Sequence, residues 1–161
     1  MTGKGGASEI GALQVRRAEL AQLEPAARLF QGYLRFYEKS TPEEASRGFI
    51  EDRLRRQDSV IFLAWLDDLA VGFVQLYPSF ASLSLAPSWI LNDLYVEPAA
   101  RGHGVGEALM QAARELARGN GAAEILLQTA RDNATAQRLY ERLGYQRDDE
   151  FLVYTLSLPP G

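Results

Sequence analysis

The sequence predicts an α+β fold, a sandwich of helices around one mixed β-sheet, and three observations predict it. Apolar residues alternate between the two-residue repeat of strands and the 3.6-residue repeat of helices several times along the chain. Two apolar runs, 60–66 and 69–77, are separated by only two residues, which is typical of an antiparallel hairpin. Helical segments connect the later runs, as crossover connections do. Hairpins and crossovers together describe one mixed sheet.

The bulk properties set the size and class of the protein. With 161 residues the chain has the usual length of one domain. Residues 1–11 contain four glycines and little to bury, so we expect a flexible N-terminal tail followed by a single domain over 12–161. A net charge of −4 disfavours nucleic acid as a partner.

Two features that the sequence lacks indicate the compartment in which we expect the protein. There is no cysteine, which excludes disulfides and cysteine nucleophiles and favours the cytoplasm. No apolar run approaches the roughly 20 residues that a membrane-spanning helix needs. We therefore expect a cytoplasmic protein that does not enter a membrane.

The first half of the chain begins with a strand over 13–17. Apolar side chains then recur at helical spacing behind Pro25, namely Ala26, Leu29, Phe30, Tyr33 and Tyr37. The run Thr41-Pro42-Glu43-Glu44 has the form of a capping box and predicts a second helix to about Arg56. The hairpin over 60–77 follows.

The second half alternates strands and helices. A connection over 79–88 leads to a strand over 89–96, which stops at Glu97-Pro98. The most regular apolar stripe predicts a helix from Val105 to about Ala117, ending at Gly119 and Gly121. Further segments predict a strand over 124–129, a helix over 133–143 and a last strand over 151–158.

Residues 101–106 (RGHGVG) form a glycine-rich loop between a strand and the most regular helix. Such a loop directs backbone N–H groups and the positive helix end at one point, which suits a phosphate. A tight strand-to-helix turn explains the glycines equally well. A nucleotide P-loop is excluded because Glu107 and Ala108 stand where Lys and Ser or Thr are needed, and Glu107 also breaks a dinucleotide fingerprint.

Two motifs in the right order carry a family resemblance. The first is R-x-x-G-x-G at 101–106, after the strand that ends in LYVEP; the second is NATAQRLYERLGY at 133–145. They resemble the acetyl-CoA-binding and C-terminal motifs of the GNAT superfamily over 89–145. The resemblance implies a three-layer GNAT fold with a sheet of six to seven strands and about four helices. It also implies transfer of an acetyl group from acetyl-CoA to a primary amine, on a small molecule or on a protein lysine or N-terminus.

The resemblance implies how the coenzyme is held. The loop backbone would bind its pyrophosphate, through Arg101, Gly102, His103, Gly104, Val105 and Gly106. Strands in this family splay apart so that the pantetheine arm pairs with backbone at Leu94, Tyr95 and Val96. The Leu94 N–H would also donate to the thioester carbonyl. Asn133 contacts the pantetheine arm, caps its own helix, or does both.

The same resemblance assigns the proton transfers. Tyr140 matches the position of the general acid that protonates the coenzyme A thiolate, although its helical spacing alone favours core packing. Asp93 and Glu97 are candidate bases, with Asp93 better placed, and salt bridging is the alternative. Without cysteine we expect direct attack in a ternary complex. One histidine and no cysteine make a metal site implausible.

Aromatic residues are the candidates for the acceptor side. The segment 33–37 (YLRFY) resembles a GNAT subgroup that includes histone, D-amino-acid and polyamine acetyltransferases. Tyr33, Tyr37, Tyr77 and Trp89 would line the pocket, and core packing is the alternative. Polyamine enzymes carry two acidic residues where this chain has Asn92-Asp93, which puts a polyamine substrate in doubt. Strict alternation places Trp89 and Asp93 on one face of their strand, unless a bulge common in the family shifts the register.

Two further expectations concern assembly and an alternative function. The last strand has an apolar edge and suggests a homodimer, an arrangement frequent in such proteins. The alternative function is a non-catalytic coenzyme A-binding sensor or interaction module on the same fold.

Overall fold

The computed structural model of the protein describes residues 11–160. These residues form a five-stranded mixed sheet whose strands follow chain order. The strands are β1 (Leu13–Arg17), β2 (Val60–Leu66), β3 (Leu69–Ala81), β4 (Ala86–Val96) and β5 (Ile125–Leu127). Antiparallel pairing joins β1 to β4 in order, and β5 joins β4 in parallel. The mixed α+β architecture is confirmed, with five strands in place of the expected six to seven.

Four α-helices accompany this sheet in the described residues, as expected. They are α1 (Leu23–Phe36), α2 (Glu43–Arg56), α3 (Val105–Gly119) and α4 (Ala134–Arg142), with short 3-10 turns at Leu20–Gln22, Ser82–Ser84 and Pro98–Ala100. The chain divides into two compact units, one through Gln128 and one from Thr129. The sheet and α1 to α3 belong to the first unit, and α4 belongs to the second. The tail expected over 1–11 lies outside the described residues, apart from Gly11.

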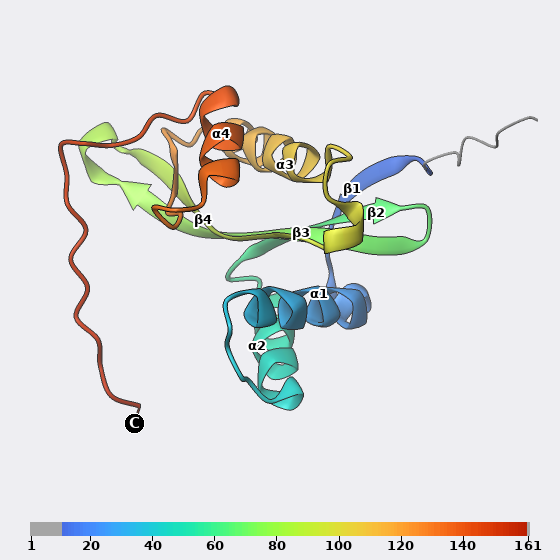
Figure 1. The fold of residues 1–161 in the computed structure, drawn as a ribbon. Helices are drawn as coiled ribbons and strands as arrows, with labels where there is room; N and C mark the ends of the chain where they lie inside the picture. Colours follow the sequence, from blue (N-terminus) through green and yellow to red (C-terminus); the bar gives the residue numbers. More distant parts are fainter. Residues whose placement is uncertain (1–10, 161) are drawn as a thin grey trace, which may run out of the picture. The chain divides into compact units, whose positions relative to one another are not determined.

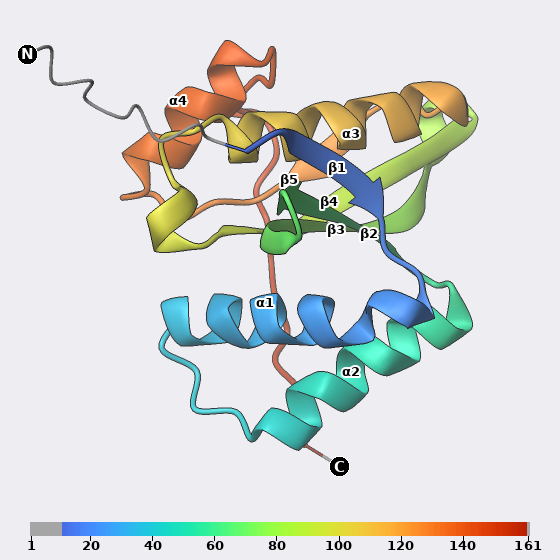
Figure 2. The same cartoon turned by 90° about the vertical axis from the view of Figure 1, so that its right-hand side faces the viewer.

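The first unit has three layers. Helices α1 and α2 cover one face of the sheet and α3 covers the other (Figures 1 and 2). The apolar stripe of α1 supplies Leu29 and Phe30, which pack in one core cluster with Ile50 of α2 and Phe73 of β3. The helical periodicity of these residues explains the arrangement, because it collects them on the face that meets the sheet.

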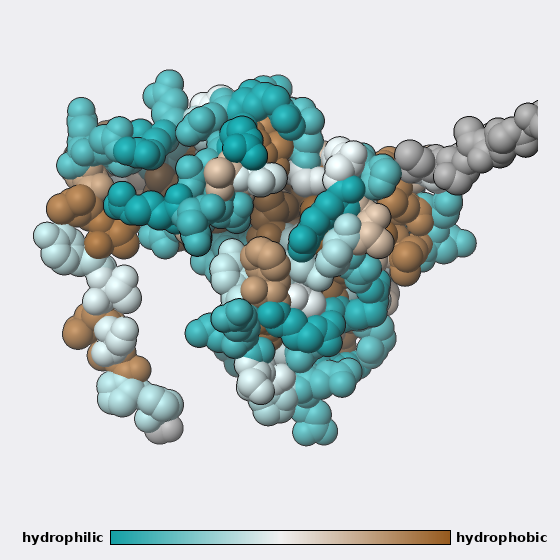
Figure 3. All heavy atoms as spheres, in the orientation of Figure 1, coloured by the Kyte–Doolittle hydropathy of each residue, from teal (hydrophilic) through white to brown (hydrophobic). Residues whose placement is uncertain are grey.

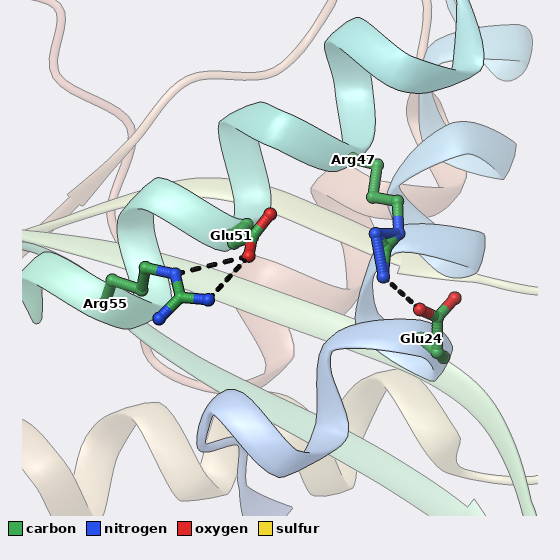
Figure 4. Close-up of polar contacts among 4 residues, drawn as sticks. All are labelled: Glu24, Arg47, Glu51 and Arg55. Atoms are coloured by element: carbon green, nitrogen blue, oxygen red, sulfur yellow. Dashed lines mark hydrogen bonds and ion pairs between the residues drawn. The ribbon is translucent and has the colours of Figure 1, made fainter.

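The contact between α1 and α2 is apolar inside and charged outside. Phe30 stacks on Phe49 with ring centroids 5.6 Å apart. At the surface Arg47 of α2 pairs with Glu24 of α1, while Arg55 pairs with Glu51 within α2 at 2.9 Å (Figure 4). Exposed pairs of this kind contribute at most about 1 kcal/mol each, so apolar burial holds the two helices together.

The start of α2 differs from the predicted capping box. Pro42 occupies the cap position, one residue later than expected, and no side chain caps the helix. The Pro42 carbonyl instead accepts hydrogen bonds from the N–H groups of Ala45 and Ser46. The prediction of a capping box was wrong because Pro42 lies before the helix with an extended backbone. Thr41 is therefore out of capping range.

The hairpin between β3 and β4 is longer than predicted. Most of the expected connection over 79–88 is paired, and Ala81 lies opposite Ala86. The shorter hairpin between β2 and β3 is confirmed, and Asp67 takes the left-handed backbone conformation (φ 53°) that its two-residue turn requires.

The predicted last strand is absent from the described residues. No strand is assigned over 151–158, and the apolar side chains there are at least 73 % exposed: Phe151, Leu152, Val153, Tyr154, Leu156 and Leu158. Figure 3 shows brown, apolar atoms along this terminal segment. Alternation makes a segment able to form a strand, but the strand also needs a partner. The sheet ends at β5, which is only three residues long.

Candidate active site

A β-bulge in β4 divides the strand into two parts. Gln75 pairs with Asp93 and Leu76 pairs with Leu91, which leaves Asn92 as the extra residue. Strict alternation is therefore broken. Trp89 donates its indole N–H to Asn120 at the end of α3 (3.0 Å). Asp93 instead lies beside Tyr33 of α1, which is on the other side of the sheet. The shared face predicted for Trp89 and Asp93 is wrong because of this bulge.

Beyond the bulge, one edge of β4 is open. Strand β5 pairs with β4 only from Trp89 to Leu91. The Glu97 N–H donates to the Val71 carbonyl at 2.8 Å, which makes Gly72 and Val96 a non-hydrogen-bonded pair. By the alternation of an antiparallel ladder, the backbone groups of Leu94 and Val96 point away from β3. The three residues from Leu94 to Val96 thus present backbone donors and acceptors along the edge of β4 that β5 does not pair with.

The glycine loop lies at the end of this open edge. Gly102 and Gly104 have left-handed φ angles of 80° and 77°, which glycine adopts without strain. Gly104 precedes α3, and its carbonyl accepts the first helical hydrogen bond from Ala108 (3.0 Å). The N–H groups of Val105 and Gly106 belong to the first turn, where no helical carbonyl is in place to accept them. The loop therefore has the geometry of an anion site.

The side chains of the loop lie away from this point. The Arg101 guanidinium donates to the Val96 carbonyl (3.1 Å) and lies over the Phe36 ring at 5.5 Å. His103 is exposed. Gly106 lies within α3, so its glycine is not required by the backbone conformation. The contribution of the loop to an anion site comes from its backbone and from the positive end of α3.

Asp93 is a buried carboxylate surrounded by donors. Its side chain is 4 % exposed. Oδ2 accepts a hydrogen bond from Gln75 Nε2 at 2.7 Å, Oδ1 accepts one from Asn92 Nδ2 at 3.0 Å, and Tyr33 lies close enough for the charge of Asp93 to act on its hydroxyl. Gln75, which is fully buried, in turn accepts from Ser59 Oγ at 2.8 Å. A buried carboxylate is tolerated when it is satisfied in this way.

The tyrosines near Asp93 are held in their neutral form. Burial, followed by the charge of Asp93, raises the pKa of Tyr33 well above its usual range. The same two causes raise the pKa of Tyr77 to about 12. Both phenols therefore remain hydrogen-bond donors at neutral pH. Tyr37 packs edge-on against Tyr33 with ring centroids 4.9 Å apart.

The structure gathers some of the predicted residues and separates others. Tyr33, Tyr37 and Tyr77 lie around Asp93, while Trp89 does not. Glu97, the other candidate base, forms an ion pair with Arg28. Tyr95 lies with its ring against Gly32 of α1, where an added Cβ would come within 2.8 Å of the hydroxyl. Any role of Tyr95 toward a coenzyme belongs to its backbone.

Sequence reasoning missed Gln75 and Ser59. A signal existed, because Gln75 is the single polar residue in the apolar run 69–76 (LAVGFVQL). A polar side chain in a strand that is buried on both faces must find a buried partner. The sequence could not name that partner, since Ser59, Gln75 and Asp93 come from three separate segments.

The second unit carries the other motif. Asn133 caps α4, and its side chain accepts from the Ala136 N–H at 3.2 Å. Tyr140 lies on α4, is half-buried, and its ring centroid is 6.1 Å from that of Tyr145. The Tyr145 N–H donates to the Tyr140 carbonyl at 3.0 Å, which closes the turn after the helix. Capping by Asn133, one of its two expected roles, is therefore observed.

Comparison with known proteins identifies the family. The model of the acetyltransferase (GNAT) family matches residues 26–145. The chain belongs to this family. This GNAT chain is 39 % identical to an uncharacterized N-acetyltransferase, YhfO of Bacillus subtilis, over 91 % of its own length and 99 % of the relative. By family it is an acyltransferase of the N-acetyltransferase class.

Solved structures agree with this GNAT assignment. The crystal structure of a probable acetyltransferase is 44 % identical, covers 92 % of this chain and 99 % of its own, and has a TM-score of 0.86. The aminoglycoside acetyltransferase AAC(6')-Iy, solved with a bisubstrate analogue of coenzyme A, shares the fold at 21 % identity with a TM-score of 0.77, over 92 % of this chain and all of its own.

The described residues of this GNAT chain contain neither a metal-binding cluster nor a membrane-spanning helix. Among residues 11–160, no group of three or more His, Cys, Asp or Glu side chains is arranged to hold a metal ion. Within the same residues, no helix combines the length and apolar character needed to cross a bilayer.

Proposed function

We propose that this GNAT enzyme transfers the acetyl group of acetyl-CoA to a primary amine by direct attack in a ternary complex. One observation supports it above all: a four-residue stretch, Asp93 to Val96, joins a buried carboxylate to an open strand edge that leads into the glycine loop. A carboxylate suits an amine, and an open edge followed by an anion site suits pantetheine and pyrophosphate.

The residues present fit acetyl-CoA. A Cβ added at Gly102 or Gly104 would meet nothing within 4 Å, so the space above the loop is open to a ligand. The loop backbone over 101–106 would bind the pyrophosphate, and the backbone of Leu94 and Val96 would pair with the pantetheine arm. Acetyl-CoA supplies the activated acetyl group. The Leu94 N–H, directed away from β3, would donate to the thioester carbonyl.

Asp93 is the proposed base, and it acts through Tyr33. In this proposal the Tyr33 hydroxyl, which lies beside Asp93, donates to that carboxylate, and its oxygen lone pairs accept an N–H of the amine. As the amine gives a proton to Tyr33, Tyr33 passes its own proton to Asp93. The phenol stays neutral throughout, which agrees with its raised pKa. Tyr37 and Tyr77 would line the acceptor site beside it.

The charge of the site bears on the acceptor. An alkyl amine is mostly protonated at neutral pH, and a single buried carboxylate matches a single ammonium group. We therefore propose a primary amine with one cationic group at the reacting end, on a small molecule or on a protein lysine or N-terminus. Asn92, which stands beside Asp93, adds no second charge for a diamine.

Tyr140 is the proposed general acid for the leaving thiolate. The support is its position in the motif of residues 133–145 and its phenol, which can donate a proton to sulfur. Asn133 has its side chain engaged at the cap of α4, so its contribution to coenzyme binding would come from positioning the start of that helix.

A thiol-release assay tests the function. Purified protein is incubated with acetyl-CoA and a panel of amines, amino acids and basic peptides, and the products are identified by mass. We expect one amine class to release thiol, and Asp93→Asn and Tyr140→Phe each to reduce kcat/KM by about 100-fold or more, as loss of general acid or base catalysis does. Binding of coenzyme A without any acetylation would instead favour a non-catalytic sensor. Failure to bind coenzyme A would contradict the proposal.

We further propose a cytoplasmic homodimer. The support for the dimer is the apolar segment over 151–158, whose side chains are exposed and whose backbone belongs to no strand in the described residues. The support for the cytoplasm is the absence of cysteine.

A further inference from the structure

We infer that Ser59 and Gln75 form a buried positioning relay that orients the Asp93 carboxylate for proton transfer. The inference rests on the proposed function, in which Asp93 is the base. It assigns a role to two residues that touch neither the amine nor the coenzyme.

The direction of the hydrogen bonds carries the argument. A carboxylate can only accept, so the NH2 end of the Gln75 amide must face Asp93, at 2.7 Å. The amide oxygen then faces Ser59, whose hydroxyl donates to it at 2.8 Å. Asp93 thereby fixes which way the amide points, and Ser59 satisfies the amide oxygen in that orientation. A flipped amide would place two oxygens together at Asp93.

Burial makes this orientation consequential. Gln75 has no exposed surface, and Ser59 and Asp93 are 8 % and 4 % exposed. Water therefore does not replace a missing donor, and hydrogen bonds in a row polarise one another in a medium of low dielectric constant. The relay approaches Asp93 from β3, while Tyr33 approaches from α1, so the carboxylate is flanked by different elements.

Other groups face this cluster and set its electrostatic background. Tyr33 belongs to α1, Tyr37 is the C-cap residue that follows it, and Tyr77 belongs to β3. The Arg53–Asp58 ion pair (2.7 Å) lies within electrostatic range of Tyr77. Its two charges act on Tyr77 in opposite directions: Arg53 lowers the pKa of Tyr77 and Asp58 raises it.

The test uses two substitutions at Gln75 that change the donor in different ways. Gln75→Met keeps the length of the side chain and removes the donor; Gln75→Glu replaces the donor with a second carboxyl group. We follow the protonation midpoint of Asp93 by the ¹³C chemical shift of its carboxyl carbon, together with the pH profile of kcat/KM. We expect Gln75→Met to move both to higher pH by about one unit, since a hydrogen bond to a charged group is worth about that much. Gln75→Glu should move them further, because two adjacent carboxylates share a proton.

Ser59 provides a milder pair of variants that retain the glutamine. Ser59→Ala should shift the Asp93 midpoint in the same direction as Gln75→Met, and Ser59→Thr, which keeps the hydroxyl, should leave it near the wild-type value. A merely structural role predicts changes in the free energy of unfolding without any of these shifts.

The outcomes separate the inference from the proposed function. A folded Gln75→Met or Ser59→Ala protein whose Asp93 midpoint equals that of the wild type overturns the relay, whatever the activity. Shifts in the midpoint together with an Asp93→Asn enzyme of normal activity would retain the orientation of Asp93 and reject its role as base. The spectroscopic readout does not depend on finding the correct amine.

Discussion

At the residue scale, the chemistry of the acceptor side depends on how one carboxylate is kept in a buried position. Asp93 receives hydrogen bonds from Gln75 and Asn92, and Tyr33 of α1 lies beside it. Removing one donor would leave the remaining charge poorly satisfied, which costs more than the hydrogen bond itself contributes. This explains why a polar residue such as Gln75 stands in an otherwise apolar strand.

Because the pKa of Tyr77 is raised, the free energy of unfolding varies with pH in the alkaline range. The folded protein retains the phenol proton up to about pH 12, whereas the unfolded chain releases it near the ordinary pKa of 10.0. Between these values the unfolded state binds fewer protons, so the free energy of unfolding falls as pH rises. We expect Tyr77→Phe to make this decline shallower in urea denaturation at pH 9 to 12. Tyr154→Phe, at an exposed site, is the matched control, and equal slopes for all three proteins would contradict the prediction.

At the scale of elements, β4 has two structural roles. From Trp89 to Leu91 it is paired on both sides, with β3 and with β5. Its second part, after the bulge at Asn92, is paired only with β3. The bulge therefore brings Asp93 to the α1 side just where the other edge opens. One extra residue joins the acceptor side to the proposed coenzyme side.

A substitution in the glycine loop tests its role in binding the coenzyme, and a substitution at the end of α3 is the control. Gly104→Ala forces a left-handed backbone on alanine, at a cost of about 1 to 2 kcal/mol in the free energy of unfolding. We also expect coenzyme A to bind about 10-fold or more weakly by calorimetry, because the loop N–H groups lose their alignment. Gly119→Ala, at the helical end of α3 where an added Cβ meets nothing within 4 Å, should leave binding unchanged. Equal affinity in both variants would exclude the loop as the pyrophosphate site.

Local sequence patterns predicted most elements, and their failures have physical causes. The stripe of Val105, Leu109 and Ala113 predicted α3 because burial on one face depends only on helical spacing. The segment 151–158 failed because alternation cannot supply a partner strand. The faces of β4 failed because a bulge is decided by pairing between strands. Within the site, Asp93 and Tyr33 were predictable as chemical types, whereas the Ser59–Gln75 relay exists only through tertiary contact.

At the scale of the whole molecule, the two family motifs lie in different compact units. The glycine loop and the open edge of β4 belong to the unit that ends at Gln128, and Tyr140 belongs to the unit that begins at Thr129. The proposed base, Asp93, and the proposed acid, Tyr140, thus come from separate parts of one chain. The order of the two motifs along the sequence is the basis of this assignment. The family match over residues 26–145 spans both units.

The terminal segment supports a prediction about assembly. Residues 151–158 expose six apolar side chains in one short run, and such a run is a template for pairing with another chain. We expect Leu152→Asp combined with Leu156→Asp to convert a dimer into a monomer in sedimentation velocity experiments. The pairing would bury these side chains, and an aspartate there would have to be desolvated. Leu83→Asp is the matched control, because Leu83 is a fully exposed leucine at the tip of the β3–β4 hairpin. A dimer that persists in the double variant would place the interface elsewhere, and a wild-type monomer would reject the homodimer altogether.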